Sequence, residues 1–189
     1  MTAHIISTSL TFIINLSLMF GYCPNDLKMA LVSPAHKGKG ETNKETNYRP
    51  LSVISHIGKA LETSVHEQFI DYLILHKFIT PDQFAYLKYH STQLCLHRLV
   101  DDILENINAN EITGLCFLDI KKCFDSIDHN ILLTKLHKYG IKGNEISWFH
   151  SYLNNRSQIV ANNGERSSKS YINIGVPQGT ILGPVLFLL

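Results

Sequence analysis

The sequence predicts an α+β fold for this chain of 189 residues. Three observations predict it. Two long segments carry apolar residues at helical spacing, and several short apolar runs lie between turn-forming residues. The composition, 44% hydrophobic and 17% charged, provides enough apolar side chains for a packed core. The length suits one domain of ordinary size.

Helices are predicted wherever apolar residues recur at intervals of three or four. The first long helix covers about residues 58–78, and the second begins after Ser91, a residue type that caps helix N-termini. Shorter helices are predicted at residues 130–139 and 145–153. The apolar residues that define the first helix are Leu61, Val65, Phe69 and Leu73.

Strands are predicted in short segments bounded by turn residues. The apolar run at residues 114–118 is typical of a strand buried on both faces. Residues 162–164, Asn-Asn-Gly, form a strong turn signal between the last two strands. The predicted strands cover residues 29–32, 112–120, 157–161 and 170–176.

The N-terminal segment, residues 5–20, is apolar enough to resemble a signal-peptide core. No Lys or Arg precedes it, no small-residue cleavage site follows it, and several Ser, Thr and Asn residues interrupt it. It is also short and polar for a spanning helix. We therefore expect a buried helix rather than a membrane segment, with a membrane anchor as the alternative.

The charge and cysteine content exclude some classes of site. The net charge of +1 gives no general support for nucleic-acid binding, although residues 33–50 read as a basic loop. A solvated surface is the alternative interpretation of that loop. The four cysteines include no CxxC pair, which argues against a zinc site and fits a reducing compartment. The cations of the loop are Lys37, Lys39, Lys44 and Arg49.

Two segments have the residue types needed for chemistry. Residues 117–129 read FLDIKKCFDSIDH, in which an apolar run delivers Asp119 at its end. A carboxylate in that position suits Mg²⁺, although an Asp that caps the next turn would look the same. Residues 175–184 read GVPQGTILGP, with more glycine and proline around Gln178 than an ordinary turn requires.

Taken together, these two segments resemble motifs A and B of LINE-type (non-LTR, jockey-like) reverse transcriptases. Residues 47–52, NYRPLS, are similar to a fingers motif of that family, and Gln83-Phe84 with His90-Ser91-Thr92 is similar to the next motif. The linking segments at residues 138–141 and 151–158 also match. The resemblance extends from about residue 5 to the end of the chain.

The resemblance implies a right-hand polymerase fold. Residues 1–110 would form a fingers-like region, and residues 111–189 a partial palm whose sheet is incomplete. The implied activity is RNA-directed DNA synthesis on an RNA template, with a DNA primer and deoxynucleotide triphosphates as partners and Mg²⁺ as cofactor. The implied location is intracellular, in the nucleus or cytoplasm.

Residue roles follow from the same resemblance. Asp119, with the backbone carbonyl of Ile120, would hold the catalytic magnesium. Phe124 would be the aromatic gate against a ribose 2′-hydroxyl, with a core phenylalanine as the alternative. Gln178 and Gly179 would contact template and nucleotide. The cations expected to bind phosphates are Lys37, Lys39 and Arg49.

Two departures from the family pattern bear on activity. No aromatic-Ala-Asp-Asp turn, the family's motif C, follows residue 184, so we expect a truncated sequence. Leu87 stands where the family has an arginine for the triphosphate, and Lys88 lacks the bidentate fork that would replace it. We therefore expect a polymerase fragment that is inactive alone. The alternatives are a non-catalytic RNA-binding or regulatory relic and a protein anchored in a membrane through residues 5–20.

Overall fold

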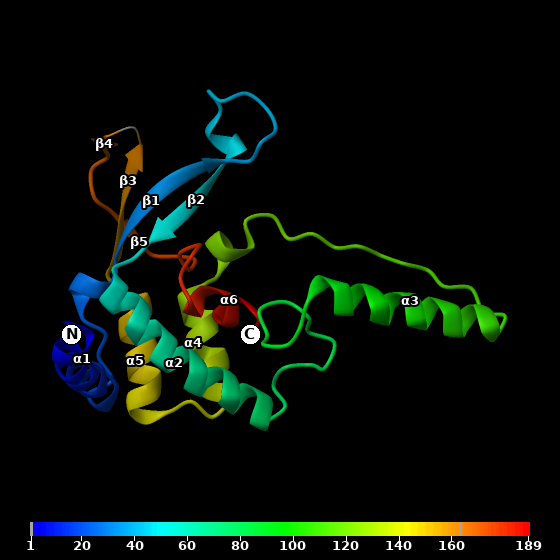
Figure 1. The fold of residues 1–189 in the computed structure, drawn as a ribbon, viewed down its shortest axis with the longest axis horizontal. Helices are drawn as coiled ribbons and strands as arrows, with labels where there is room; N and C mark the ends of the chain where they lie inside the picture. The colour runs from blue at the N-terminus through cyan, green and yellow to red at the C-terminus, as the bar shows by residue number, and fades with distance from the viewer. Residues whose placement is uncertain (1, 163) are drawn as a thin grey trace. The chain divides into compact units, whose positions relative to one another are not determined.

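The computed structural model describes residues 2–162 and 164–189 and contains helices together with a small mixed sheet (Figure 1). The predicted combination of helices and strands is confirmed at this level. The chain divides into two compact units, the first formed by residues up to 70 and from 122 onward, the second by residues 71–121. This division concerns packing alone, so the assignment of residues 1–110 to fingers and 111–189 to palm stays a prediction.

The sheet of the first unit has the strand order β2-β1-β3-β4, with β5 also paired to β3. Strand β1 is antiparallel to β2 and parallel to β3, whereas β4 and β5 are antiparallel to β3. Ala30 and Val32 of β1 are buried and alternate with exposed neighbours, as expected of a half-buried strand. The strands are β1 (Met29–His36), β2 (Tyr48–Val53), β3 (Arg156–Asn162), β4 (Glu165–Arg166) and β5 (Ser170–Ile172).

The predicted basic loop at residues 33–50 is wrong in extent, because much of it forms a β-hairpin. Strand β1 continues to His36 and pairs with β2, so only the tip of the hairpin is irregular. Pro34 and Pro50 lie opposite each other in this pair. Proline is normally a signal against a strand because it cannot donate a ladder hydrogen bond. The two prolines are therefore the reason why the sequence did not predict β2.

The remaining strand predictions are partly confirmed. Strand β3 covers the predicted residues 157–161, but β5 ends at Ile172, short of the predicted 176. The predicted turn at 162–164 includes Asn163, which lies outside the described residues. Strand β4, which was not predicted, follows this turn as a two-residue strand paired with β3.

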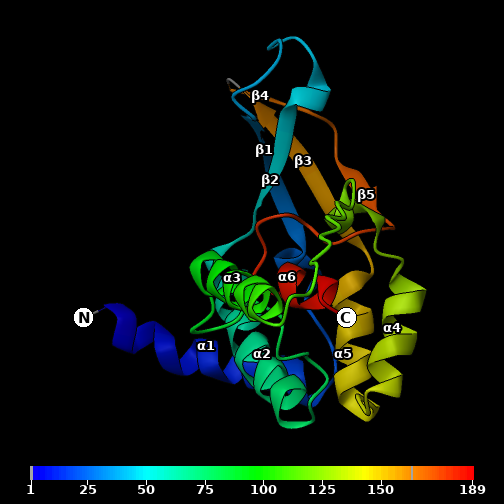
Figure 2. The same ribbon diagram turned by 90° about the vertical axis from the view of Figure 1, so that its right-hand side faces the viewer.

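Four helices of the first unit lie side by side below the sheet (Figures 1 and 2). Leu61, Val65 and Phe69 form the buried stripe predicted for the first long helix, and the Phe69 ring lies 5.0 Å from that of Phe149. These helices are α2 (His56–Leu75), α4 (His129–Lys138), α5 (Gly143–Leu153) and α6 (Leu182–Phe187). Short 3-10 turns occur at η1 (Asn25–Leu27), η2 (Glu45–Asn47) and η3 (Cys123–Ser126).

Helix α1 (Thr2–Met19) confirms the predicted N-terminal helix but not its burial. Phe12 is 63% exposed and Ile13 46%, so much of the helix faces outward. Its end is fixed through Ser17, whose hydroxyl accepts a hydrogen bond from the Trp148 indole at 3.0 Å. In the described part of the chain, no helix is both long and apolar enough to cross a bilayer.

The second unit contains helix α3 (Thr92–Asn108), which begins where predicted. The Ser91 hydroxyl accepts a hydrogen bond from the Leu94 amide at 3.2 Å, as an N-cap does. The strand predicted at residues 112–120 is wrong. These residues form an unpaired segment in which Phe117 and Leu118 are exposed. A strand exists only where a second strand accepts its hydrogen bonds, and an apolar run cannot reveal whether one is present.

Helix α4 offers a test of the core. Leu136 is fully buried, whereas Ile131 on the same helix is 61% exposed. We expect Leu136→Ala to lower the free energy of unfolding by about 2–5 kcal/mol, because it removes buried methyl groups and leaves a cavity. Ile131→Ala should change it by about 0.5 kcal/mol or less. Urea unfolding followed by circular dichroism measures both; equal losses would contradict the packing described.

Candidate functional site

Three segments that are distant in sequence meet in the first unit. The Ser52 amide, at the end of the NYRPLS segment, donates a hydrogen bond to the Gln178 carbonyl at 2.7 Å. The Val176 amide donates to the Phe124 carbonyl at 2.8 Å. The segment from 175 to 179 is therefore held by backbone hydrogen bonds to β2 on one side and to η3 on the other.

Two glycines make these close approaches possible. Gly179 has a φ of +101°, and a Cβ atom there would lie 2.9 Å from the Ser52 carbonyl oxygen. Gly175 has a φ of +82°, and its Cβ would lie 2.8 Å from both the Phe124 carbonyl oxygen and the Asp125 Cα. Side chains rarely tolerate either condition. The glycines of the GVPQG segment are thus required by the packing of backbone against backbone.

A histidine and two aspartates fix the turn that follows η3. Buried His129 lies with Nε2 2.8 Å from the Gly175 carbonyl oxygen. The Asp128 carboxylate accepts hydrogen bonds from the Asn130 and Ile131 amides, which makes it the N-cap of α4. The Gln178 side-chain amide lies 3.5 Å from Asp125 Oδ1, within reach of a weak hydrogen bond. The contacts of Asp125 and Asp128 therefore orient the local structure of the turn.

Phe124 lies at the edge of this site. Its side chain is half-buried, and its ring centroid lies 5.2 Å from that of Phe187 in α6. The contact agrees with the alternative of a packing phenylalanine, and the exposed part of the ring leaves the gate role available. That role stays a prediction.

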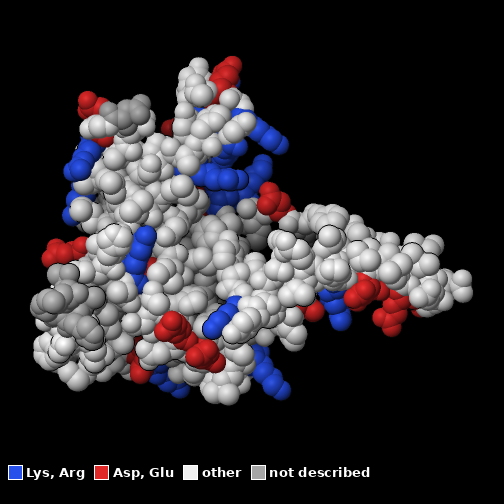
Figure 3. All heavy atoms as spheres, in the orientation of Figure 1, with Lys and Arg blue, Asp and Glu red and all other residues white. Residues whose placement is uncertain are grey.

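The cations of the hairpin differ in how they are held. Lys37 donates through Nζ to the Thr46 carbonyl at 2.7 Å, and Lys44 pairs with Glu41 at 3.0 Å. Lys39 and Arg49 are exposed. Figure 3 shows Lys and Arg side chains gathered along one side of the hairpin, with Asp or Glu side chains at its tip. The hairpin therefore presents positive charge to solvent, where a polyanion has access to it.

The predicted metal ligands lie in the second unit. Asp119 and Ile120 belong to the exposed, unpaired segment described above and are not at the end of a strand. Mg²⁺ requires six oxygen ligands in near-octahedral geometry, and these two residues provide one carboxylate and one carbonyl. Among the described residues, no three His, Cys, Asp or Glu side chains form a group that could hold a metal. The residues present do not complete a magnesium site by themselves.

Sequence reasoning missed two residues of the site, Glu62 and His129. Both are buried polar side chains whose partners lie more than 40 positions away in sequence. The only available signal for Glu62 was its position beside Leu61, at the edge of an apolar helix stripe.

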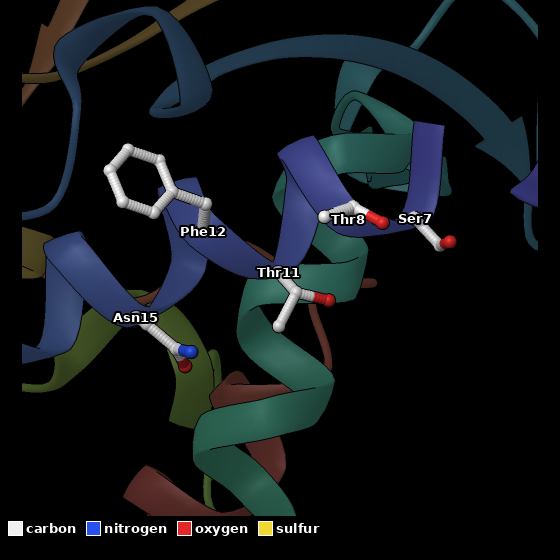
Figure 4. A pocket seen from close by; sticks show the side chains of 5 residues that line it. All are labelled: Ser7, Thr8, Thr11, Phe12 and Asn15. Atoms are coloured by element: carbon white, nitrogen blue, oxygen red, sulfur yellow. The ribbon is translucent and has the colours of Figure 1, made fainter. Parts of the chain in front are cut away.

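A shallow hollow on α1, lined by Ser7, Thr8, Thr11, Phe12 and Asn15, carries no ionisable side chain and involves none of the motifs (Figure 4).

Comparison with known proteins gives a consistent result. Residues 37–189 match the family described as reverse transcriptase (RNA-dependent DNA polymerase). The chain is 34% identical over 179 residues to the RNA-directed DNA polymerase from mobile element jockey of Drosophila melanogaster. It is 31% identical over 185 residues to the probable RNA-directed DNA polymerase from transposon BS of the same species. Each alignment covers 94% of this chain, but only 19% and 20% of the respective relative.

The two glycine environments give a matched test of the backbone contacts. Gly175 and Gly38 both have positive φ, +82° and +76°, but a Cβ at Gly38 would meet nothing within 4 Å. We expect Gly38→Ala to cost about 1 kcal/mol from its left-handed conformation alone. Gly175→Ala should cost about 1–3 kcal/mol more, because its methyl group must displace backbone. Unfolding free energies from urea titration distinguish the two variants; a similar loss in both would contradict the close contact at η3.

Proposed function

The chain belongs to the reverse transcriptase family of RNA-dependent DNA polymerases, and we propose that it supplies the part of a mobile-element polymerase that contacts template and incoming nucleotide. Because the chain spans about a fifth of the length of the curated relatives it matches, the activity of the whole protein belongs to this proposal. In the proposal, residues 1–110 act as fingers and residues 111–189 as part of a palm.

The observation that carries the proposal is the meeting of three motif segments at the Gln178–Gly179 turn. The Ser52 amide binds the Gln178 carbonyl, and Gly179 lies against Ser52 without a side chain between them. Gln178 is left half-buried, with its amide near Asp125. A turn with a bare glycine backbone and an adjacent amide side chain suits contact with a nucleotide base and sugar, which is the role proposed for Gln178 and Gly179.

The hairpin would contribute electrostatically. Lys37, Lys39 and Arg49 would neutralise phosphates of the template or the triphosphate, and this interaction weakens as salt concentration rises. Asp119, with the Ile120 carbonyl, would bind Mg²⁺ once other ligands complete the coordination. The Phe124 ring would exclude nucleotides whose sugar carries a 2′-hydroxyl. A protein that uses an RNA template and deoxynucleotides would act inside the cell, in the nucleus or cytoplasm.

A second candidate is a non-catalytic RNA-binding protein derived from the element. The exposed cations Lys39 and Arg49 favour it, because they can bind a phosphate backbone without any catalytic site. Deoxynucleotide triphosphates discriminate between the candidates. They should strengthen binding to a primer–template hybrid if a nucleotide site exists, and leave it unchanged if the chain only binds RNA.

The hairpin cations can be tested by binding. We expect Arg49→Ala to weaken binding of an RNA–DNA hybrid and to reduce the slope of log K against log salt by about one. Lys142→Ala provides the control, because Lys142 is an exposed cation at the start of α5. Fluorescence anisotropy across a salt series measures both variants. Equal effects would indicate general charge attraction and count against a site on the hairpin.

Catalysis by the chain alone is tested by primer extension with Mg²⁺ or Mn²⁺. We expect no extension, because two-metal nucleotidyl transfer requires several carboxylates and Asp119 is the only carboxylate that the resemblance assigns to the metal. Leu87 also lacks the charge that an arginine would offer to the triphosphate. Templated extension by the unchanged chain that disappears in Asp119→Ala would show that the chain contains a complete catalytic set.

A further inference from the structure

Glu62 is a charged residue type buried in the core of the first unit. It lies on α2 and is only 2% exposed. Burying a carboxylate is costly unless hydrogen bonds replace the water it loses. Its position therefore requires an explanation from its partners.

Those partners belong to two other helices. Glu62 Oε1 accepts a hydrogen bond from the Tyr152 hydroxyl of α5 at 2.8 Å. Glu62 Oε2 accepts from the Ile181 amide at 2.7 Å and, more weakly, from the Leu182 amide at 3.4 Å, where α6 begins. One carboxylate thus connects α2, α5 and the start of α6.

Tyr152 is itself held in place. The Arg156 guanidinium lies over its ring at 4.5 Å, and Arg156 Nη1 donates to the Tyr152 carbonyl at 3.3 Å. Both side chains are almost completely buried. Burial raises the pKa of the Tyr152 hydroxyl, opposed by the nearby Arg156 charge and reinforced by Glu62. The hydroxyl therefore remains protonated, as a donor to Glu62 must be.

The Ile181 amide is only three residues beyond Gln178, and hydrogen bonds within the connecting residues hold them in one conformation. Thr180 Oγ1 donates to the Pro177 carbonyl at 2.9 Å and accepts from the Gly183 amide at 3.2 Å. These bonds make residues 177–183 a tight turn that leads directly into α6. A group that fixes Ile181 consequently also fixes the position of Gln178 and Gly179.

We propose that Glu62 is a positioning residue for the Gln178–Gly179 turn. Its carboxylate, oriented by Tyr152, holds the start of α6 and thereby sets how the turn meets Ser52 at the end of β2. The consequence for template and nucleotide contact rests on the function proposed above, whereas the effect on the turn does not. An apolar side chain in this place would leave the part-buried Ile181 amide without this acceptor.

Two substitutions separate the hydrogen bonds from the charge. Glu62→Ala removes every acceptor. Glu62→Gln keeps an oxygen for the Ile181 amide and offers an NH₂ group to the Tyr152 hydroxyl, which can accept it. The Gln variant therefore keeps the acceptor for Ile181, but it loses the extra strength of a charged acceptor and the acceptor for the Tyr152 O–H hydrogen.

The test is amide hydrogen exchange of the isotopically labelled chain, followed by NMR. We expect exchange at Ile181 to accelerate at least ten-fold in Glu62→Ala and by a smaller factor in Glu62→Gln, with shifted Gly179 and Ser52 resonances. The Ile141 amide, which donates to the Leu136 carbonyl at 3.1 Å at the end of α4, should keep its rate. Unchanged exchange at Ile181 would overturn the proposal. Equal acceleration at Ile141 would also overturn it, because that result indicates a general loss of stability.

A second measurement keeps the inference separate from the proposed function. If Glu62→Ala does not fold, Glu62→Gln alone decides, and acceleration confined to Ile181 and Leu182 is the expected result. Unchanged rates in that variant would overturn the proposal. Anisotropy with an RNA–DNA hybrid is measured on the same samples. Failure of the unchanged chain to bind the hybrid would count against the proposed function, while the exchange result would still decide the role of Glu62.

Discussion

The contact between Gly179 and the end of β2 is the constraint on which the candidate site depends. The Ser52 amide binds the Gln178 carbonyl, and the space where a Gly179 side chain would lie is occupied by the Ser52 carbonyl. Two backbone segments more than 120 positions apart in sequence are therefore in direct contact. Because no side chain separates them, the turn can shift only if the backbone hydrogen bond breaks.

This contact explains the arrangement of polar residues around it. At the start of residues 175–181, the His129 ring lies within hydrogen-bond distance of the Gly175 carbonyl. The Phe124 carbonyl accepts a hydrogen bond from the Val176 amide. At the other end, the Glu62 carboxylate accepts a hydrogen bond from the Ile181 amide. The segment is thus fixed on both sides by buried groups from different elements. A rigid turn of this kind preorganises a binding surface, since little ordering remains for a ligand to induce.

The features that depend on the spacing of nearby residues could be predicted from the sequence. The buried face of α2 followed from Leu61, Val65 and Phe69, and the start of α3 from the capping residue Ser91. Sequence reasoning failed where the outcome depends on distant partners. Residues 112–120 are apolar but lack a pairing strand in the described chain, while Pro34 and Pro50 concealed a hairpin. Glu62 was missed because its partners lie 90 and 119 positions away.

The Gln178–Gly179 turn lies directly against Ser52, so a nuclear Overhauser effect between the two should be observed in solution. In the labelled chain, we predict a cross-peak between the Gly179 α-protons and the Ser52 amide proton. Cross-peaks across the β1–β2 pair, such as those between Val32 and Ser52, serve as the internal reference. The presence of the reference peaks without the Gly179–Ser52 peak would show a folded hairpin with the turn elsewhere, and would contradict this contact.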